Sequence, residues 1–367
     1  MRFFSLILSV LLMGLIGCSE KKEAKKEFQL FVGTYTDGDS EGIYKFTFDA
    51  STGALTNKNL AAVLPNPSFI KISGDKKNLY AAQETADFDS LGGGVTAFKL
   101  KDGQLELLNS MGTEGKHPCH VALSDEGYLA ASNYSGGNVS VFRLGENGEL
   151  VSNPQIIDHK VLDTAKTSHA HMAKFKGNDL FVADLGLDAV KRYSNLNHLF
   201  VASEQASIDL AEGAGPRHFV FGKEGKLLYV INELNSTITV FKQKGDGSYK
   251  EIETQSTLDS AFEGKSYCAD VHLSADGKFL YGSNRGENTI VIFAIDQNTG
   301  KLDLVGRESV RGDWPRNFAL DPSGNYLLVA NQRSNNITIY KRDVEKGMLE
   351  FLNEIKLSSP VCLEFLD

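Results

Sequence analysis

The sequence predicts an all-β protein, a seven-bladed β-propeller with four-stranded antiparallel blades. One plan recurs in it: a turn-prone anchor, a short apolar strand, an Asp/Gly turn, an aromatic-aliphatic strand and a third strand. The clearest copies are residues 215–241 and 314–340, and residues 117–142 and 266–293 follow the same plan. The copies recur every 45 to 52 residues, the length of one such blade. No long helical pattern follows residue 30, and 35 glycines against 8 prolines suit tight hairpins.

The residue before each first strand marks the start of a blade. These markers are Pro67, Pro118, His169, Pro216, Cys268, Pro315 and Pro360. The last marker leaves residues 361–367, which is enough for one strand only. The start of the chain supplies three strands without a first one, at residues 29–35, 42–48 and 54–63. We therefore expect one blade to be split between the two ends of the chain, which closes the ring and leaves no sheet edge unpaired.

Within the blades, strands are indicated by alternation and by β-branched content, as in TITVF at 237–241. Turns are indicated by pairs such as Asp102-Gly103 and Asp276-Gly277. Because the repeat spans nearly the whole chain, we predict a single propeller domain over residues 28–367.

The first residues have the character of a targeting segment. Arg2 is followed by an apolar run at 3–16, too short to span a bilayer comfortably, and Leu15-Ile16-Gly17-Cys18 resembles a bacterial lipobox. That resemblance implies a signal peptide at 1–17 and a lipid on Cys18; the alternative is an ordinary signal peptide with a chance cysteine. Residues 18–27 form a charged tether. We expect a lipid-anchored protein of the bacterial cell envelope, periplasmic or at the outer membrane, which meets the membrane only through its lipid.

Composition restricts the partners. The net charge of −9 argues against nucleic acid and suits an anionic substrate only where basic residues gather locally. After Cys18, three cysteines remain, with no CxxC pair, so neither a disulfide framework nor a haem attachment is indicated. We expect Cys119, Cys268 and Cys362 to be small buried side chains near the channel.

Blade topology predicts a polar ring at one mouth of the channel. In an antiparallel blade, the residues before strand one and after strand two lie on the same face of the ring. Six of the eight histidines fall in the first of these sets. Convergent charged groups suit a small charged substrate, although a channel can also be polar for structural reasons alone. We expect substrate-binding residues at His117, His120, His169, His218, Asn133, Asp184, Asp270 and Arg316.

Several common catalytic motifs are missing from the sequence. It contains no HExxH, no GxSxG and no phosphate-binding GxxxxGK[ST]. We expect no cofactor and no metal. A divalent cation is the open alternative, since Glu84, Asn133, Asp184, Glu233 and Asp270 carry suitable oxygen ligands.

Four motifs, NYxGG, DLGxD, GPRH followed by NE, and SNRG, occur in order at blade spacing. With them, residues 29–367 resemble the lactonase seven-bladed propeller family, which includes propeller-type 6-phosphogluconolactonases and fungal carboxymuconate cyclase. The resemblance implies a carboxylic ester hydrolase that opens a small anionic, sugar-derived lactone at the channel mouth. It implies His171, Arg217, Glu233 and Arg285 as catalytic residues, with His169 as a second candidate for the role of His171.

These groups suit lactone hydrolysis, which needs a base for water and a cation or donor for the carbonyl oxygen. A histidine can be the base, and arginines can clamp a carboxylate, a phosphate or the oxyanion. Glu233 can orient the histidine or take the proton itself. The same groups would serve lactone formation, as in the cyclase branch. A non-catalytic binding or scaffold propeller is the other alternative, because residues 227–241 also resemble the repeats of bacterial surface proteins.

Overall fold

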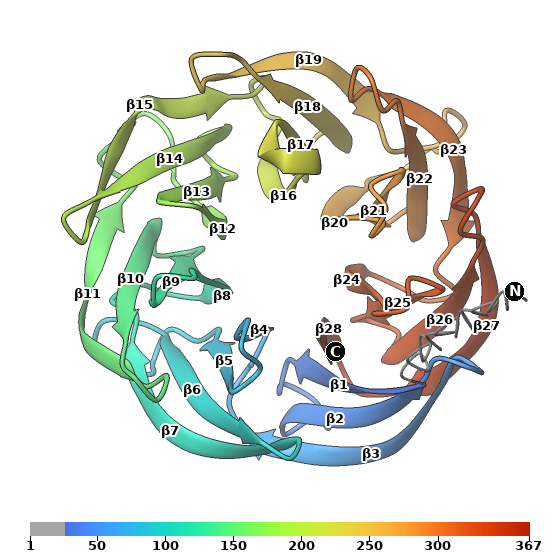
Figure 1. Ribbon diagram of the computed structural model, residues 1–367, viewed down its shortest axis with the longest axis horizontal. Helices are drawn as coiled ribbons and strands as arrows, with labels where there is room; N and C mark the ends of the chain where they lie inside the picture. Colours follow the sequence, from blue (N-terminus) through green and yellow to red (C-terminus); the bar gives the residue numbers. More distant parts are fainter. Residues whose placement is uncertain (1–25) are drawn as a thin grey trace, which may run out of the picture.

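The computed structural model describes residues 26–367. The predicted signal peptide, Cys18 and nearly all of the predicted tether lie outside these residues. Seven four-stranded antiparallel sheets stand in a ring around a central channel (Figure 1). The predicted seven-bladed propeller is therefore confirmed. Over residues 26–367, the only helical element is a 3₁₀ turn at Lys223–Gly225, so no helix there is long and apolar enough to cross a membrane.

The strands of each blade follow one another from the channel outward. The first three complete blades contain β4 (Phe69–Ile72), β5 (Asn78–Gln83), β6 (Gly94–Lys101) and β7 (Gln104–Gly112); β8 (Pro118–Leu123), β9 (Tyr128–Asn133), β10 (Asn138–Leu144) and β11 (Leu150–Asp158); and β12 (Ala170–Lys176), β13 (Asp179–Asp184), β14 (Ala189–Leu196) and β15 (Leu199–Asp209). The next three contain β16 (Pro216–Phe221), β17 (Leu227–Asn232), β18 (Thr237–Gln243) and β19 (Tyr249–Ser256); β20 (Tyr267–Leu273), β21 (Phe279–Arg285), β22 (Thr289–Ile295) and β23 (Leu302–Ser309); and β24 (Pro315–Leu320), β25 (Tyr326–Asn331), β26 (Asn336–Arg342) and β27 (Leu349–Lys356).

The remaining blade is split, as predicted. It consists of β28 (Pro360–Leu366), β1 (Glu27–Thr34), β2 (Gly42–Asp49) and β3 (Ala54–Val63) in that order. The innermost strand β28 pairs antiparallel with β1, from Leu366 opposite Gln29 to Pro360 opposite Thr34 (Figure 1). This pairing joins the two ends of the described chain and closes the ring.

Neighbouring blades are held together by apolar packing and by a repeated tyrosine contact. The hydrophobic clusters combine side chains of adjacent blades, as where Phe48 meets Tyr326 with ring centroids 5.5 Å apart. The hydroxyl of Tyr80 in β5 donates to the carbonyl of Gly148 in the next blade at 2.8 Å. Tyr229 and Tyr281 make the same bond to Gly300 and Gly347. A buried phenol thus finds its acceptor in the adjacent blade's outer hairpin.

Five inner strands, β8, β12, β16, β24 and β28, begin with a β-bulge, which determines where their side chains point. In β16, Pro216 pairs with Asn232 and His218 with Ile231, so Arg217 is the extra residue. The same skip leaves Cys119, His171 and Arg316 as extra residues in β8, β12 and β24. A bulge re-aims the side chain that it inserts. In β12 the residue equivalent to Pro216 is Ala170 rather than the predicted marker His169, so His171 corresponds to Arg217 and not to His218.

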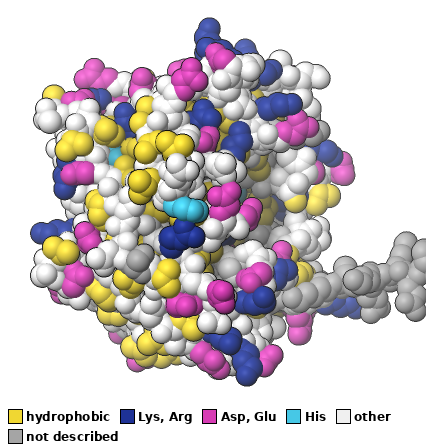
Figure 2. Space-filling model, turned by 60° about the vertical axis from the view of Figure 1, so that its left-hand side comes forward, with side chains coloured by type: hydrophobic (Ala, Val, Ile, Leu, Met, Phe, Trp, Pro, Cys, Tyr) yellow, Lys and Arg dark blue, Asp and Glu magenta, His cyan; other side chains and the backbone are white. Residues whose placement is uncertain are grey.

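The outer surface mixes both signs of charge. On the side shown in Figure 2, acidic and basic side chains are interspersed with hydrophobic ones. On this side, the basic residues are scattered rather than gathered into one patch.

Candidate active site

A cavity of about 210 Å³ lies where the inner strands begin. Four of its lining residues are the bulge residues of β8, β12, β16 and β24, and four stand at or just after the ends of β5, β9, β17 and β21. In that order they are Cys119, His171, Arg217 and Arg316, and Glu84, Tyr134, Glu233 and Arg285. The two sets are distant in sequence but share one mouth of the channel, and the structure brings the four predicted catalytic residues together there.

Glu233 links two buried arginines. Its Oε2 lies 3.0 Å from Nε of Arg217 and 2.8 Å from Nη2 of Arg285. Burial and the neighbouring Arg217 lower the pKa of Arg285 to about 10, so this guanidinium is charged at neutral pH. Arg285 is held further by the carbonyls of Tyr267 and Cys268. Glu233 thus lies between the two arginines and forms an ion pair with each.

A second ion pair occupies the other side of the cavity. Oε2 of Glu84 accepts a hydrogen bond from the Tyr35 hydroxyl at 2.8 Å and lies 3.5 Å from Nη2 of Arg316. The guanidinium of Arg316 also lies over the Tyr35 ring, 5.2 Å from its centroid. Three arginines against two glutamates leave the cavity with one excess positive charge. The cavity is therefore suited to an anion or to negative charge that develops during a reaction.

His171 is the only histidine that lines the cavity. Burial and the nearby Arg217 hold the pKa of its imidazole well below the usual value, so the ring is neutral at pH 7. A neutral imidazole is the form that a general base requires. Cys119 is less suited to chemistry, because burial raises the pKa of its thiol and keeps it protonated.

Two further predicted histidines stand at the rim. His169 stacks on Tyr134 with ring centroids 4.5 Å apart, and its Nδ1 lies 3.0 Å from the Tyr134 carbonyl. His117 is half-buried, and its Nδ1 is 2.9 Å from the Ser135 hydroxyl. Neither lines the cavity, but His169 supports the aromatic ring that does.

Other predicted site residues lie deeper or point elsewhere. His120, His218 and Asp270 are in the channel below the cavity, together with Asn317. Asn133 hydrogen-bonds to Ser140 and to the Thr113 carbonyl. Asp184 accepts bonds from His159, from Ser168 and from backbone amides. The structure thus gives Asn133 and Asp184 partners within the protein and does not place them on the cavity.

Tyr134, Cys119 and Tyr35 were not among the predicted site residues, and Glu84 was named only as a possible ligand of a cation. Tyr134, Glu84 and Tyr35 each directly follow the last residue of a strand, as Glu233 follows Asn232. Asn133 and Asp184 are instead the last residues of their strands. Because successive side chains of a strand point to opposite faces, the last residue of the strand points into the blade and the next residue points into the cavity. Choosing the residue after the strand end would therefore have identified Tyr134 from the sequence.

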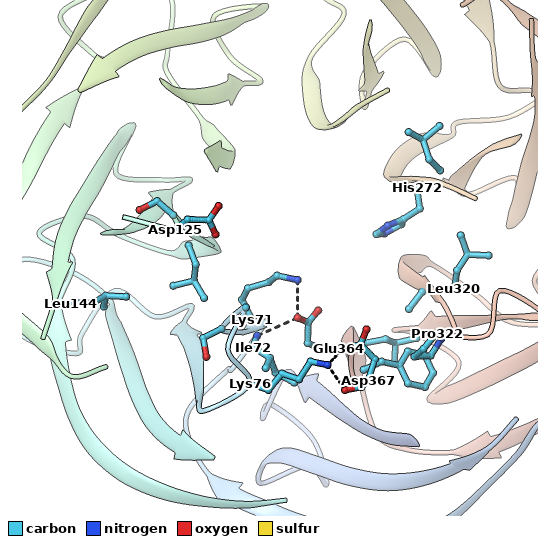
Figure 3. A pocket seen from close by; sticks show the side chains of 18 residues that line it. Lys71, Ile72, Lys76, Asp125, Leu144, His272, Leu320, Pro322, Glu364 and Asp367 are labelled. Carbon is cyan, nitrogen blue, oxygen red and sulfur yellow. Dashed lines mark hydrogen bonds and ion pairs between the residues drawn. The ribbon is translucent and has the colours of Figure 1, made fainter. Parts of the chain in front are cut away.

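A larger cavity of about 660 Å³ opens at the opposite mouth, where the inner strands end (Figure 3). Its lysines already have partners: Lys71 lies 2.7 Å from Glu364, and Lys76 lies 3.2 Å from Asp367. The smaller cavity has both the excess charge and a neutral histidine, so we favour it as the candidate site.

The oxygen ligands considered for a cation are dispersed. Glu84 and Glu233 line the cavity, Asp270 lies below it, and Asn133 and Asp184 face away. Within residues 26–367, no group of three or more His, Cys, Asp or Glu side chains has an arrangement that could hold a metal ion. Cys119, Cys268 and Cys362 are buried free thiols, as expected from their positions.

The structure is thus a seven-bladed propeller with a charged, histidine-containing cavity where the inner strands begin. The chain belongs to the lactonase, seven-bladed β-propeller family, whose model matches residues 29–365.

Individual relatives agree with this assignment. The chain is 35% identical over 346 residues to the 6-phosphogluconolactonase of Bacillus subtilis, covering 92% of this chain and 97% of the relative. It is 37% identical over 338 residues to that of Formosa agariphila, covering 88% and 95%. Among solved structures, the periplasmic gluconolactonase of Pseudomonas aeruginosa superposes with a TM-score of 0.87 at 32% identity, covering 93% and 99%.

Proposed function

We propose that this protein is a lactonase, an enzyme that opens a sugar lactone by hydrolysis in the cavity of Arg217, Glu233 and His171. The observation that carries the proposal is the convergence of three arginines, two glutamates and a neutral histidine in one cavity of about 210 Å³. The names of the relatives in Bacillus, Formosa and Pseudomonas support the same reaction class.

In the proposed reaction, His171 removes a proton from water as the water oxygen attacks the lactone carbonyl carbon. Negative charge then develops on the carbonyl oxygen, and Arg217 or Arg285 stabilises it. Glu233 contributes by holding both guanidinium groups in place before substrate arrives, which avoids reorganisation during the reaction. The ring oxygen leaves with the proton from His171, and a hydroxy acid is released.

The proposed substrate is a gluconolactone or its 6-phosphate. The excess positive charge favours an anionic lactone, in line with the names of the bacterial 6-phosphogluconolactonases. The lipobox predicted at Cys18 would place the enzyme at the cell envelope, which instead favours an unphosphorylated lactone. The name of the Pseudomonas relative, a periplasmic gluconolactonase, fits that second choice.

The test is a hydrolysis panel with gluconolactone, its 6-phosphate and unrelated lactones, each with and without a chelator. We expect turnover of a gluconolactone that persists with chelator and falls about a hundredfold or more in kcat in Arg217→Ala. Arg192→Ala is the matched control, because Arg192 forms an ion pair with Asp179 at 2.6 Å but does not line the cavity. Full activity of Arg217→Ala would refute the assigned role of the arginine.

The same panel, extended by an unsaturated dicarboxylic acid, decides between the alternatives. Loss of activity with chelator, restored by a divalent cation, would overturn the metal-free reaction. Ring closure of an unsaturated acid without lactone opening would indicate the cyclase direction. No turnover of any lactone would favour a binding or scaffold propeller.

A further inference from the structure

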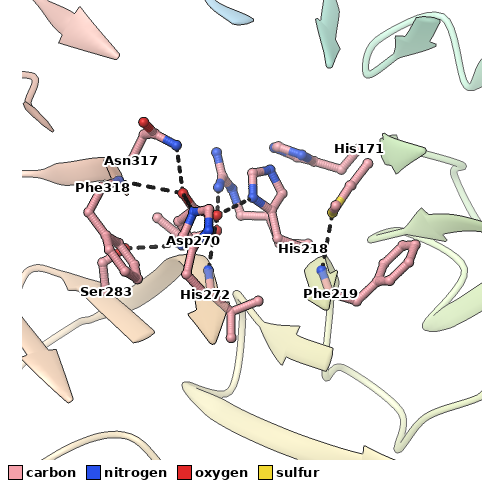
Figure 4. A network of polar contacts seen from close by, with 12 residues as sticks. His171, His218, Phe219, Asp270, His272, Ser283, Asn317 and Phe318 are labelled. Atoms are coloured by element: carbon pink, nitrogen blue, oxygen red, sulfur yellow. Dashed lines mark hydrogen bonds and ion pairs between the residues drawn. The ribbon is translucent and has the colours of Figure 1, made fainter. Parts of the chain in front are cut away.

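A buried polar network lies directly behind the cavity, centred on Asp270 (Figure 4). Oδ1 of Asp270 accepts hydrogen bonds from Nδ1 of His218 at 2.7 Å and from its neighbouring amide, that of Val271, at 2.9 Å. Oδ2 accepts from Nε2 of His272 at 2.9 Å and from the Asn317 amide at 2.6 Å. Burial raises the pKa of Asp270, but His272 and His218 outweigh it and hold this pKa well below its usual value. Asp270 is therefore an ionised acceptor of several hydrogen bonds.

This carboxylate fixes the tautomer of His218. An ionised carboxylate only accepts, so Nδ1 of His218 must carry the hydrogen. Burial and Arg217 lower the pKa of His218 to about 4 despite Asp270, so the ring is neutral and its Nε2 holds a lone pair. That Nε2 is buried and has no hydrogen-bond partner. A buried nitrogen without a partner is costly, which calls for a function at this position.

The ring of His171 is next to the ring of His218. The rings of His171 and His218 are 5.1 Å apart between centroids and inclined at 67°. Figure 4 shows His218 between Asp270 and His171. Nδ1 of His171 is also buried and without a partner, while His171 itself lines the cavity. If Nδ1 of His171 carries a hydrogen, it can donate to Nε2 of His218, directly or through one water molecule, and both nitrogens then have a hydrogen-bond partner.

We propose that His218 is a positioning residue for His171. Its Nε2 accepts the hydrogen on Nδ1 of His171, which leaves the lone pair of His171 on Nε2, facing the cavity. This inference rests on the proposed lactonase function. It extends the site to a relay of His171, His218 and Asp270, in which the carboxylate never faces the substrate.

In the proposed reaction, the relay returns every proton that it takes up. As the water oxygen bonds to the carbonyl carbon, Nε2 of His171 takes the water proton and the ring becomes an imidazolium. The lone pair of His218 and the charge of Asp270 stabilise that cation. When the bond from the carbonyl carbon to the ring oxygen breaks, the same proton passes to the departing oxygen. Lactone and water give the hydroxy acid, and the relay returns to its starting state.

Other charges around the relay oppose the imidazolium. Arg217 in β16 and Arg316 in β24 both lower the pKa of His171, and a proton on His218 or His120 would lower it further. His218 itself faces Arg217, Asp270 and His272. Glu84 and Glu233 line the cavity with His171, but they form ion pairs with Arg316 and with Arg217 and Arg285. Asp270 is a further carboxylate, and a link through His218 is the route by which it can favour a proton on His171.

The first test reads the tautomers directly in the wild-type protein and uses variants only to assign the signals. In the protein labelled with ¹⁵N-histidine, two-bond nitrogen–proton spectra at pH 7 distinguish Nδ1–H from Nε2–H rings. We expect the Nδ1–H form for both His218 and His171, assigned by the loss of each signal in His218→Phe and His171→Phe. An Nε2–H ring at His218 or at His171 would overturn the proposal whether or not the protein opens lactones.

The second test compares His218→Phe with His198→Asn in gluconolactone hydrolysis across pH 4 to 8. The phenyl ring at position 218 keeps the aromatic packing. We expect kcat of His218→Phe to fall by about a hundredfold, with KM little changed because His218 does not line the cavity. Losing the acceptor on Nδ1 lowers the pKa of His171, so the acidic limb of the kcat profile should move to lower pH. A structural defect would lower active protein without moving that limb.

His198→Asn is the matched control, since it removes a histidine whose Nδ1 lies 2.8 Å from the Tyr128 hydroxyl and which belongs neither to the cavity lining nor to the relay. We expect wild-type rates and an unmoved pH profile from it. An unchanged limb in His218→Phe, with active wild-type protein, would overturn the relay while leaving the lactonase proposal intact. Wild-type protein that opens no lactone would refute the proposed function, and the tautomers would then decide the geometry alone.

Discussion

Replacing Glu233 with glutamine should destabilise the protein and unbalance its cavity. Glu233 is the shared partner of two buried arginines, whose side chains are 2% and 5% exposed. Removing one member of a buried pair costs about 3 to 5 kcal/mol, because the remaining charge is left uncompensated. Glutamine keeps one oxygen to accept a hydrogen bond, so we expect the lower end of this range, about 3 kcal/mol.

The expected change in melting temperature follows from chain length. Unfolding entropy is about 2.1 cal/mol/K per residue, or roughly 0.7 kcal/mol/K for about 340 ordered residues. A loss of about 3 kcal/mol therefore lowers Tm by about 4 °C. Asp179→Asn, which breaks the half-buried pair with Arg192, is the control and should cost about 1 °C.

The assay is thermal unfolding with and without phosphate. In Glu233→Gln, three arginines face one glutamate, so a bound anion should raise Tm by several degrees more than it does in the wild type. The variant should also lose about tenfold or more in kcat/KM for lactone. A variant that melts with the wild type, and responds to phosphate no more strongly, would refute the idea that Glu233 compensates these arginines.

Three further outcomes are expected. Burial lowers the pKa values of His120, His171 and His218 in the folded state, so the free energy of unfolding should fall as pH drops below about 6.5. For His218 the expected loss between pH 7 and pH 5 is about 2 kcal/mol, which urea unfolding at these two pH values measures. Equal unfolding free energies at both values would contradict the neutral channel. Deleting residues 360–367 should expose β1 as an unpaired edge and give aggregates in size-exclusion chromatography, whereas a monodisperse product would show that β28 is dispensable. Cys18→Ala should abolish fatty-acid labelling and release the protein from membranes, and unchanged fractionation would count against the predicted lipobox.

The ring was accessible from the sequence because its signals are local. Alternation in each strand and Asp/Gly turns between strands fix the blades, and their spacing fixes the count. The split blade followed from what was missing at each end of the repeat, and the pairing of β28 with β1 confirms it.

The detailed composition of the site was less accessible, because β-bulges change the register by one residue. Spacing alone aligned His171 with His218, whereas pairing aligns His171 with Arg217. The same one-residue problem favoured Asn133 over its neighbour Tyr134. The pairing of each carboxylate with an arginine depends on blade curvature and side-chain length. Local sequence patterns predict neither of these.

The pairing of β28 with β1 has a consequence for biogenesis. The innermost strand of this blade is synthesised after the other strands of all seven blades. Until then, the nascent chain can form only an unclosed ring of sheets, in which β1 lacks its partner strand. If the chain is exported unfolded, as the predicted signal peptide implies, closure must wait until translocation is nearly complete. A protease or chaperone that recognises unpaired strand edges would then act on truncated chains that lack β28 and leave complete chains alone.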